Sequence, residues 1–168
     1  MKKENINEFI EAYKKAKYFV LKEDNFDKAP ENIDFLITVD LIIPQIDTLI
    51  ESSRLNHSSW TYITAFNPYS DLKMQSMEEN QNKNEQLLKE LKEHPDKFII
   101  RYGFGTGSEY DEQKGISEQS NLKWQPEESF WVLGISREDA MAFGRKYKQN
   151  AILFGEKSTP TELVILNQ

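Results

Sequence analysis

The sequence of 168 residues contains no cysteine, which excludes disulfide bonds, thiolate zinc sites and cysteine nucleophiles. It has no run of 18 apolar residues, so no transmembrane helix is expected. Residues 1–7 lack the apolar core of a secretory signal peptide. The two histidines, His57 and His94, lie in loop-like segments without a second ligand close by, so no metal site or other cofactor is expected. These absences predict a soluble, cytoplasmic protein of bacterial type.

Basic residues are outnumbered by acidic ones, 21 to 28, and are nowhere concentrated. The formal net charge is −7, with acidic and basic residues interleaved along the chain. A duplex-binding protein needs a cluster of lysine and arginine, so duplex nucleic acid is not an expected partner, and neither is a membrane. Gly103-Phe-Gly-Thr-Gly107 lacks the spacing of a dinucleotide fingerprint and the Gly-Lys-Ser/Thr ending of a P-loop. A glycine-rich hairpin or a mobile lid is the better interpretation of this segment.

The length fits one domain over residues 1–168, and the hydrophobic spacing predicts alternating helices and strands. Helices are expected at 6–16, from Pro44, at 76–93 behind a Ser76–Glu79 capping box, and after Ser136. Strands are expected at 18–21, 35–41, 60–65, 97–102, 128–133, 151–154 and 162–166. The fold class is therefore α/β (α+β): a single-domain mixed β-sheet with flanking helices. Strand 35–41, the helix from Pro44 and strand 60–65 predict a right-handed βαβ crossover with two parallel strands.

Three polar clusters lie beside the strand-like runs, at residues 64–70, 124–129 and 148–150. Loops that converge on one edge of an α/β sheet commonly form a ligand pocket. The Asn67-Pro68 turn has a purely structural interpretation, in which the asparagine bonds the backbone that follows it. In the functional interpretation, Asn67 and Ser70 point into a crevice at the end of the strand.

Asn80 lies on the stripe that leads into the apolar face of helix 76–93. A buried amide needs hydrogen-bond partners, so Asn80 either ties the helix to the Asn67 turn or binds a ligand. Asn82 falls off this stripe and is expected to be solvated.

The second and third clusters supply further candidates. Glu127 and Ser129 share one face of their strand, and Glu127 is a candidate general base or ligand-binding carboxylate, although a solvated charge is the commoner case. Asn150 fits a left-handed helix terminator, which leaves Gln149 as the better site candidate. Trp124 would either stack on a planar ligand or anchor a long loop.

Four motifs agree in order and spacing with a known family. They are Thr64-Ala65-x-Asn67-Pro68-x-Ser70, Glu79-Asn80 with Leu87 and Leu91 behind, Trp124 with Glu127-x-Ser129 and Gly134, and Gln149-Asn150-Ala151. On these residues the chain resembles the DUF3293 family, a domain of unknown function, from about residue 13 to 154. The resemblance implies a shared fold and a shared site, but no reaction.

These observations favour a protein that binds a small polar or nucleotide-like ligand at a strand-end crevice. The ligand-binding candidates are Asn67, Ser70, Asn80, Trp124, Glu127, Ser129 and Gln149. Glu127 and Ser70 are the candidates for catalysis should the protein be a hydrolase or transferase. The alternative is a non-catalytic interaction protein whose polar motifs only hold the fold. The loop 103–126 exceeds the roughly 12–15 residues of ordinary connections, which predicts a mobile lid beside the pocket.

Overall fold

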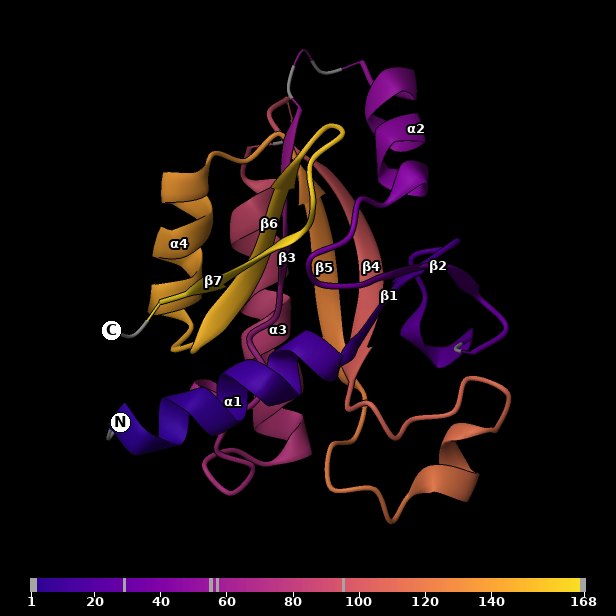
Figure 1. Cartoon of the computed structure of the whole chain (residues 1–168), viewed down its shortest axis with the longest axis vertical. Helices are drawn as coiled ribbons and strands as arrows, with labels where there is room; N and C mark the ends of the chain where they lie inside the picture. The colour runs from indigo at the N-terminus through magenta and orange to yellow at the C-terminus, as the bar shows by residue number, and fades with distance from the viewer. Residues whose placement is uncertain (1–2, 29, 55, 57, 95, 167–168) are drawn as a thin grey trace.

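A computed structural model describes residues 3–28, 30–54, 56, 58–94 and 96–166 (Figure 1). His57 lies outside the described residues. The α-helices are α1 (Lys3–Lys15), α2 (Pro44–Ser52), α3 (Met77–Lys92) and α4 (Arg137–Lys146). The strands are β1 (Lys17–Leu21), β2 (Ile33–Ile37), β3 (Ser59–Ile63), β4 (Ile99–Thr106), β5 (Glu127–Leu133), β6 (Ala151–Glu156) and β7 (Glu162–Ile165). Across these described residues, every helix is too short or too polar to cross a lipid bilayer.

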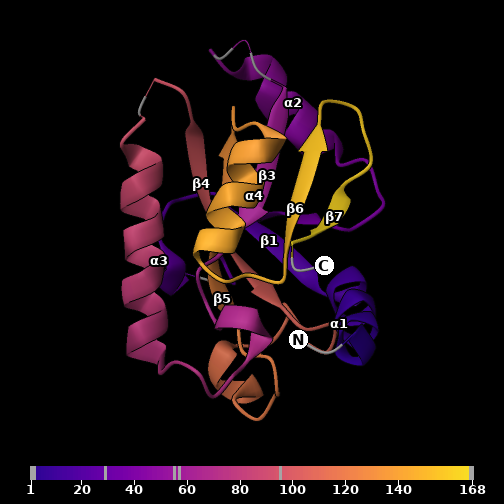
Figure 2. The same cartoon turned by 90° about the vertical axis from the view of Figure 1, so that its left-hand side faces the viewer.

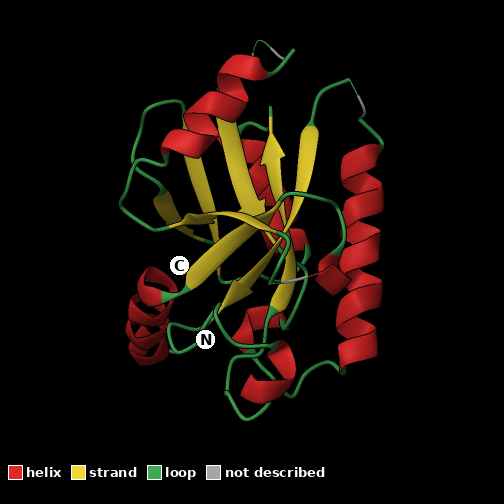
Figure 3. Ribbon diagram, turned by 90° about the vertical axis from the view of Figure 1, so that its right-hand side faces the viewer, coloured by secondary structure: helices red, strands yellow, loops and turns green. Residues whose placement is uncertain are grey.

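The seven strands form one sheet in the order β2-β1-β4-β5-β3-β6-β7. Three hairpins, β1–β2, β4–β5 and β6–β7, account for half of the neighbouring pairs. β3 completes the sheet by pairing with β5 on one side and β6 on the other. The sheet is twisted and strongly curled, with helices against both of its faces (Figure 3).

The two faces of the sheet pack against different helices. α3 and α4 lie side by side over one face (Figure 2), where Leu87 and Leu91 of α3 pack with Phe130 and Val132 of β5. α2 covers one end of the other face, where Ile46 belongs to a separate core cluster. Alternate residues of each strand supply the two cores because successive side chains point to opposite sides of the sheet. The expected α/β class is confirmed.

The local signals at the helix starts are also present. Ser76 and Glu79 form the expected capping box, since each side chain accepts a hydrogen bond from the other residue's backbone nitrogen. The side chain of Ser136 accepts a hydrogen bond from the backbone nitrogen of Asp139 at the start of α4. Local sequence therefore sets where these helices begin.

The expected strand pairing was wrong. β2 and β3 do run in the same direction, but β1, β4 and β5 lie between them, so they do not form an adjacent parallel pair. Every neighbouring pair of the seven strands is antiparallel, where a mixed sheet was expected. The reason is that both edges of β3 are already paired, one with β5 and the other with β6, so neither edge is left for β2.

Antiparallel pairing also sets which segments meet at the end of the sheet. β5 and β6 both run opposite to β3, so the end of β3 lies beside the beginnings of both neighbours. The residues after β3, before β5 and before β6 are therefore brought together. These are the three polar clusters found in the sequence. The predicted convergence is correct, although antiparallel pairing causes it rather than a shared carboxyl edge of parallel strands.

Candidate functional site

A cavity of about 330 Å³ lies at this end of the sheet, on the face that α2 covers further along. Residues of α1 line one side of it, and residues of the loop 107–126 line another. In Figure 1 both segments lie below the sheet. Its size is at the lower end of the roughly 300–1,000 Å³ typical of small-molecule sites. Its wall contains many aromatic and aliphatic side chains: Phe9, Tyr13, Tyr18, Tyr62, Phe66, Leu122, Trp124, Leu153 and Leu163. Polar groups are added by Asn67, Ser70, Thr106, Ser129, Gln149 and Asn150, and charged ones by Lys15, Glu109, Lys123 and Glu127.

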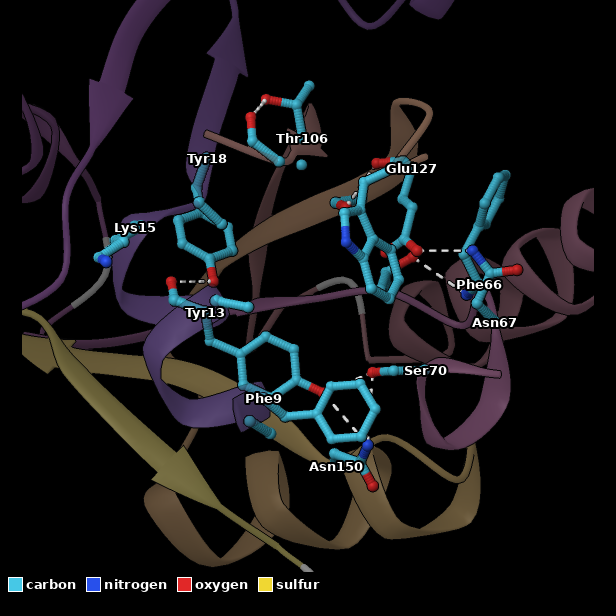
Figure 4. A pocket seen from close by; sticks show the side chains of 18 of the residues that line it. Phe9, Tyr13, Lys15, Tyr18, Phe66, Asn67, Ser70, Thr106, Glu127 and Asn150 are labelled. Carbon is cyan, nitrogen blue, oxygen red and sulfur yellow. Dashed lines mark hydrogen bonds between the residues drawn. The ribbon is translucent and has the colours of Figure 1, made fainter. Parts of the chain in front are cut away.

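Glu127 and Asn67 form a hydrogen-bonded pair on the cavity wall. The Nδ2 of Asn67 donates to Oε1 of Glu127 across 2.6 Å (Figure 4). Asn67 follows β3 and Glu127 opens β5, so the antiparallel pairing of these strands creates the contact. Within the described residues, no lysine, arginine or histidine forms an ion pair with this carboxylate.

The environment of Glu127 favours the protonated carboxyl. Burial raises its pKa to about 7, and the hydrogen bond from Asn67 only partly opposes this effect. The charge on Glu127 in turn adds to the effect of burial in raising the pKa of Tyr13, Tyr18 and Tyr62. A carboxyl that titrates near neutral pH can both donate and accept a proton, which is what general acid–base chemistry requires.

A second cluster of hydrogen-bonded side chains is centred on the hydroxyl of Ser70. Ser70 Oγ is hydrogen-bonded to the phenol of Tyr13 from α1, and Asn150 Nδ2 donates to both oxygens, at 3.3 Å and 3.1 Å respectively (Figure 4). These three residues come from α1, the turn after β3 and the residue before β6. The contacts join the N-terminal helix to the sheet at the cavity.

The turn that carries Asn67 and Ser70 has an unusual backbone. Asn67, Tyr69 and Ser70 all have a positive φ, at 46°, 54° and 58°. Non-glycine residues in such conformations cost on the order of 1 kcal/mol or more each, and they cluster at functional sites. Hydrogen bonds hold the turn in place, among them Tyr69 N to Lys148 O at 2.6 Å.

Asn80 supports this turn from behind and is not part of the cavity wall. Its Oδ1 accepts from the backbone nitrogen of Asn67, and its Nδ2 donates to Oδ1 of Asn67, both at 2.9 Å. One turn further along α3, Asn84 accepts a hydrogen bond from Ala65 N and donates one to the backbone oxygen of Glu128. Both asparagines are buried. The alternative in which Asn80 ties α3 to the turn is the one the structure supports.

The remaining candidates lie on the cavity wall and differ in their burial and hydrogen bonding. Gln149 is buried, and its Nε2 donates to Phe66 O and Tyr147 O. These bonds connect the end of α4 to the segment that follows β3. Ser129 is buried and donates to the backbone oxygen of Glu127 at 2.8 Å. Trp124 is only partly buried and packs closely over Gly107.

Two interpretations from the sequence need correction here. The left-handed residue after α4 is Lys148, with φ 57°, and not Asn150. Asn150 is instead buried among Tyr13 and Ser70, because it precedes β6 at the end of the sheet that α1 covers. Gly103 and Gly105 lie within β4, so the loop begins at Gly107.

Apart from Trp124, sequence reasoning missed the aromatic residues of the cavity. Phe9 and Tyr13 were assigned to the apolar stripe of a helix, and Tyr18 and Tyr62 to ordinary strand positions. Only the packing of α1 across the end of the sheet brings these rings together. No motif in the sequence distinguishes them from core residues.

The loop 107–126 is attached to the sheet through Tyr110 and is held together internally by Gln119. Tyr110 is 1% exposed and packs against Phe19 and Phe104. Gln119 is buried, donates to Asp111 O and accepts from Asp111 N. The loop borders the cavity as expected, while its mobility stays a prediction.

The site has one carboxyl group suited to proton transfer but no evident partner for it. In the part of the chain that the structure describes, no group of three or more histidine, cysteine, aspartate or glutamate side chains could hold a metal ion. Ser70 is bonded to Tyr13 and Asn150 and not to Glu127, so no base activates its hydroxyl in this arrangement.

Comparisons with known proteins identify the family but not an activity. A search of curated proteins and a search of solved structures gave no match. The family model described as "Protein of unknown function (DUF3293)" matches residues 63–152, more than half of the chain. This range includes all three polar clusters, although it is shorter than the 13–154 expected from the motifs. The chain therefore belongs to the DUF3293 family, and its cavity combines residues inside the matched range with α1 and β1, which precede it.

Proposed function

We propose that the protein binds a small planar ligand, of the size of a nucleobase or nucleoside, in the cavity between α1 and the sheet. The observation that carries this proposal is the Glu127–Asn67 pair on a wall formed largely by aromatic rings. Proteins that recognise single bases combine stacking on aromatic side chains with hydrogen bonds to the edge of the base. Cavity volume and wall chemistry both fit such a ligand.

The hydrogen-bonding capacity of the pair supports the proposal. Asn67 uses one Nδ2 hydrogen for Glu127, and its Oδ1 accepts from Asn80. An amide carries two hydrogens on its nitrogen and a carboxylate has two oxygens, so donor and acceptor capacity remains side by side. A heterocycle edge with adjacent donors and acceptors is complementary to this arrangement.

Binding can be tested by NMR titration of ¹⁵N-labelled protein. Purine and pyrimidine bases and nucleosides form the test set, and glucose and glycine are the polar, non-aromatic controls. We expect saturable shifts at the indole N–H of Trp124, while those of Trp60 and Trp131, which lie in the core away from the cavity, change little. Trp124→Ala should weaken binding by about tenfold, since stacking of one base is worth roughly 1–3 kcal/mol. Absence of saturable shifts for every aromatic compound would contradict the proposal.

A second candidate is acid–base catalysis in a hydrolase or transferase, with Glu127 as the proton donor or acceptor. The specific observation in its favour is the pKa of about 7 at a carboxyl facing the cavity. Turnover of a bound ligand, abolished by Glu127→Gln without loss of binding, would support it. The interaction-protein alternative predicts instead that no small molecule binds, and that polar residues such as Asn80 serve the fold alone.

The cytoplasmic location and the lack of duplex or membrane partners remain part of this proposal. Cell fractionation, together with duplex DNA and lipid vesicle binding assays, would check them.

A further inference from the structure

We infer that the cavity selects a planar cation of the amidinium class, one that directs two adjacent N–H donors at Glu127. The inference rests on the binding function proposed above and specifies its ligand. It narrows the ligand from any planar heterocycle to those with a delocalised positive charge on the edge that enters the cavity, such as amidines and protonated amino-heterocycles.

The first argument is that no lysine, arginine or histidine of the described residues is a counterion for Glu127. Its side-chain partner within the described residues is the neutral amide of Asn67. The ionisable groups that surround it from α1, β1 and β3 are the phenols of Tyr13, Tyr18 and Tyr62, and burial keeps these neutral by raising their pKa. A partly buried carboxylate without a counterion is unfavourable, and a cationic ligand would compensate it.

The other charged groups on the cavity wall do not supply that counterion. Lys15, Glu109 and Lys123 are exposed residues of α1 and the loop 107–126. The ammonium of Lys123 stands over the ring of Trp124, 5.4 Å from its centroid. Solvent screens such exposed charges, so their electrostatic interaction with a bound ligand is weaker than that of the more deeply placed carboxylate.

The second argument is the shape and chemistry of the wall. Aromatic faces attract cations, and a flat delocalised cation can stack on a ring and still direct its N–H groups along the plane. Trp124 and Phe66 provide such rings beside Glu127 and Asn67. An amidinium also makes two parallel hydrogen bonds to a carboxylate, which a single ammonium cannot do. The net charge of −7 further favours the approach of a cation.

The test uses benzamidine and benzamide, which share size and shape but differ in charge. Titrations of the full chain are followed by NMR at the Trp124 indole N–H. At pH 8 we expect benzamidine to bind at least about tenfold more tightly than benzamide. Benzamidine is charged throughout pH 6–8, so its affinity should fall about tenfold from pH 8 to pH 6 as Glu127, with its pKa of about 7, takes up a proton. The affinity for benzamide should not fall in this way.

Two variants assign the preference to one carboxyl. Glu127→Gln should remove the preference for benzamidine, because a glutamine keeps the shape but not the charge. Glu128→Gln is the matched control: its side chain points to the opposite face of the sheet, so the preference should persist. Because the pH dependence is measured on the unaltered chain, it tests the inference even should Glu127→Gln fail to fold.

The outcomes separate this inference from the proposed function. Equal affinities for the two compounds, or a benzamidine preference that survives Glu127→Gln, would overturn the inference and leave the proposed function standing. Binding of neutral bases without binding of benzamidine would do the same. Failure of benzamidine, benzamide and every base and nucleoside to bind would overturn both.

Discussion

Asn80 holds Asn67 at two points, accepting a hydrogen bond from its backbone nitrogen and donating one to its side-chain oxygen, each across 2.9 Å. Asn67 in turn donates to Glu127. A chain of amides therefore runs from the first turns of α3 to the carboxyl group in the cavity. Such a network fixes the position of its members only while each remains paired.

Replacing Asn80 should destabilise the protein through this network. Asn80→Leu keeps nearly the same size but leaves the backbone nitrogen and side-chain oxygen of Asn67 without their partner, which should cost roughly 1–3 kcal/mol of unfolding free energy. Urea unfolding measures the change. Asn82→Leu, two residues along the same helix but exposed, is the control and should change stability little. Equal stability of Asn80→Leu and the unaltered protein would show that the network is not important for stability.

Gly103 in β4 has a packing role that is tested by adding one methyl group. A Cβ at Gly103 would lie 2.2 Å from the backbone oxygen of Phe19 and 2.8 Å from the hydroxyl of Tyr62. Gly103→Ala should therefore destabilise the protein by about 1–3 kcal/mol in thermal or chemical unfolding. At Gly105 the nearest atom would be 3.7 Å away, so Gly105→Ala should be tolerated. The opposite ranking of the two variants would contradict the close packing of β1, β3 and β4.

The titration of Glu127 should make stability depend on pH in a specific direction. Its pKa is about 7 in the folded protein, above the ordinary 4.5, so the folded state binds the proton more tightly. The stability that the folded state gains from this tighter proton binding is fully present below pH 4.5 and is lost as the pH rises through 7. Glu127→Gln lacks the charge, so relative to the unaltered protein it should gain on the order of 3 kcal/mol between pH 4.5 and pH 8. The difference between the two urea midpoints, measured at both pH values, checks the sign, and a constant difference would mean that Glu127 is solvated.

The loop 107–126 should move more than the sheet when the cavity is empty. It borders the cavity, and its tip at residues 112–118 has few buried side chains. We expect fast amide hydrogen exchange across residues 109–121, slowed by a bound ligand. The buried residues of β5 should stay protected under the same conditions. Uniform protection of loop and sheet without ligand would show that Tyr110 and Gln119 fix the loop rigidly and that it is no lid.

The sequence by itself determined the features that depend on short-range interactions. The Ser76–Glu79 capping box marked the start of α3 because both hydrogen bonds close within three residues. The order of the motifs around Asn67, Glu127 and Gln149 identified the family, and the polar character of those clusters indicated where the strands end. The stripe position of Asn80 predicted its burial for the same local reason.

Only the tertiary structure decided what these features form together. Strand order depends on which strands pair although they are far apart in the sequence. The local pattern of β2, α2 and β3 does not reveal that three other strands lie between β2 and β3. The aromatic wall of the cavity exists because α1 crosses the end of the sheet, which makes Tyr13 a neighbour of Ser70 and Asn150. The pKa of Glu127 is likewise a property of its surroundings, since burial and not residue type raises it. Long-range packing creates the cavity, so the sequence could predict that the three polar clusters meet, but not the aromatic wall or the surroundings of Glu127.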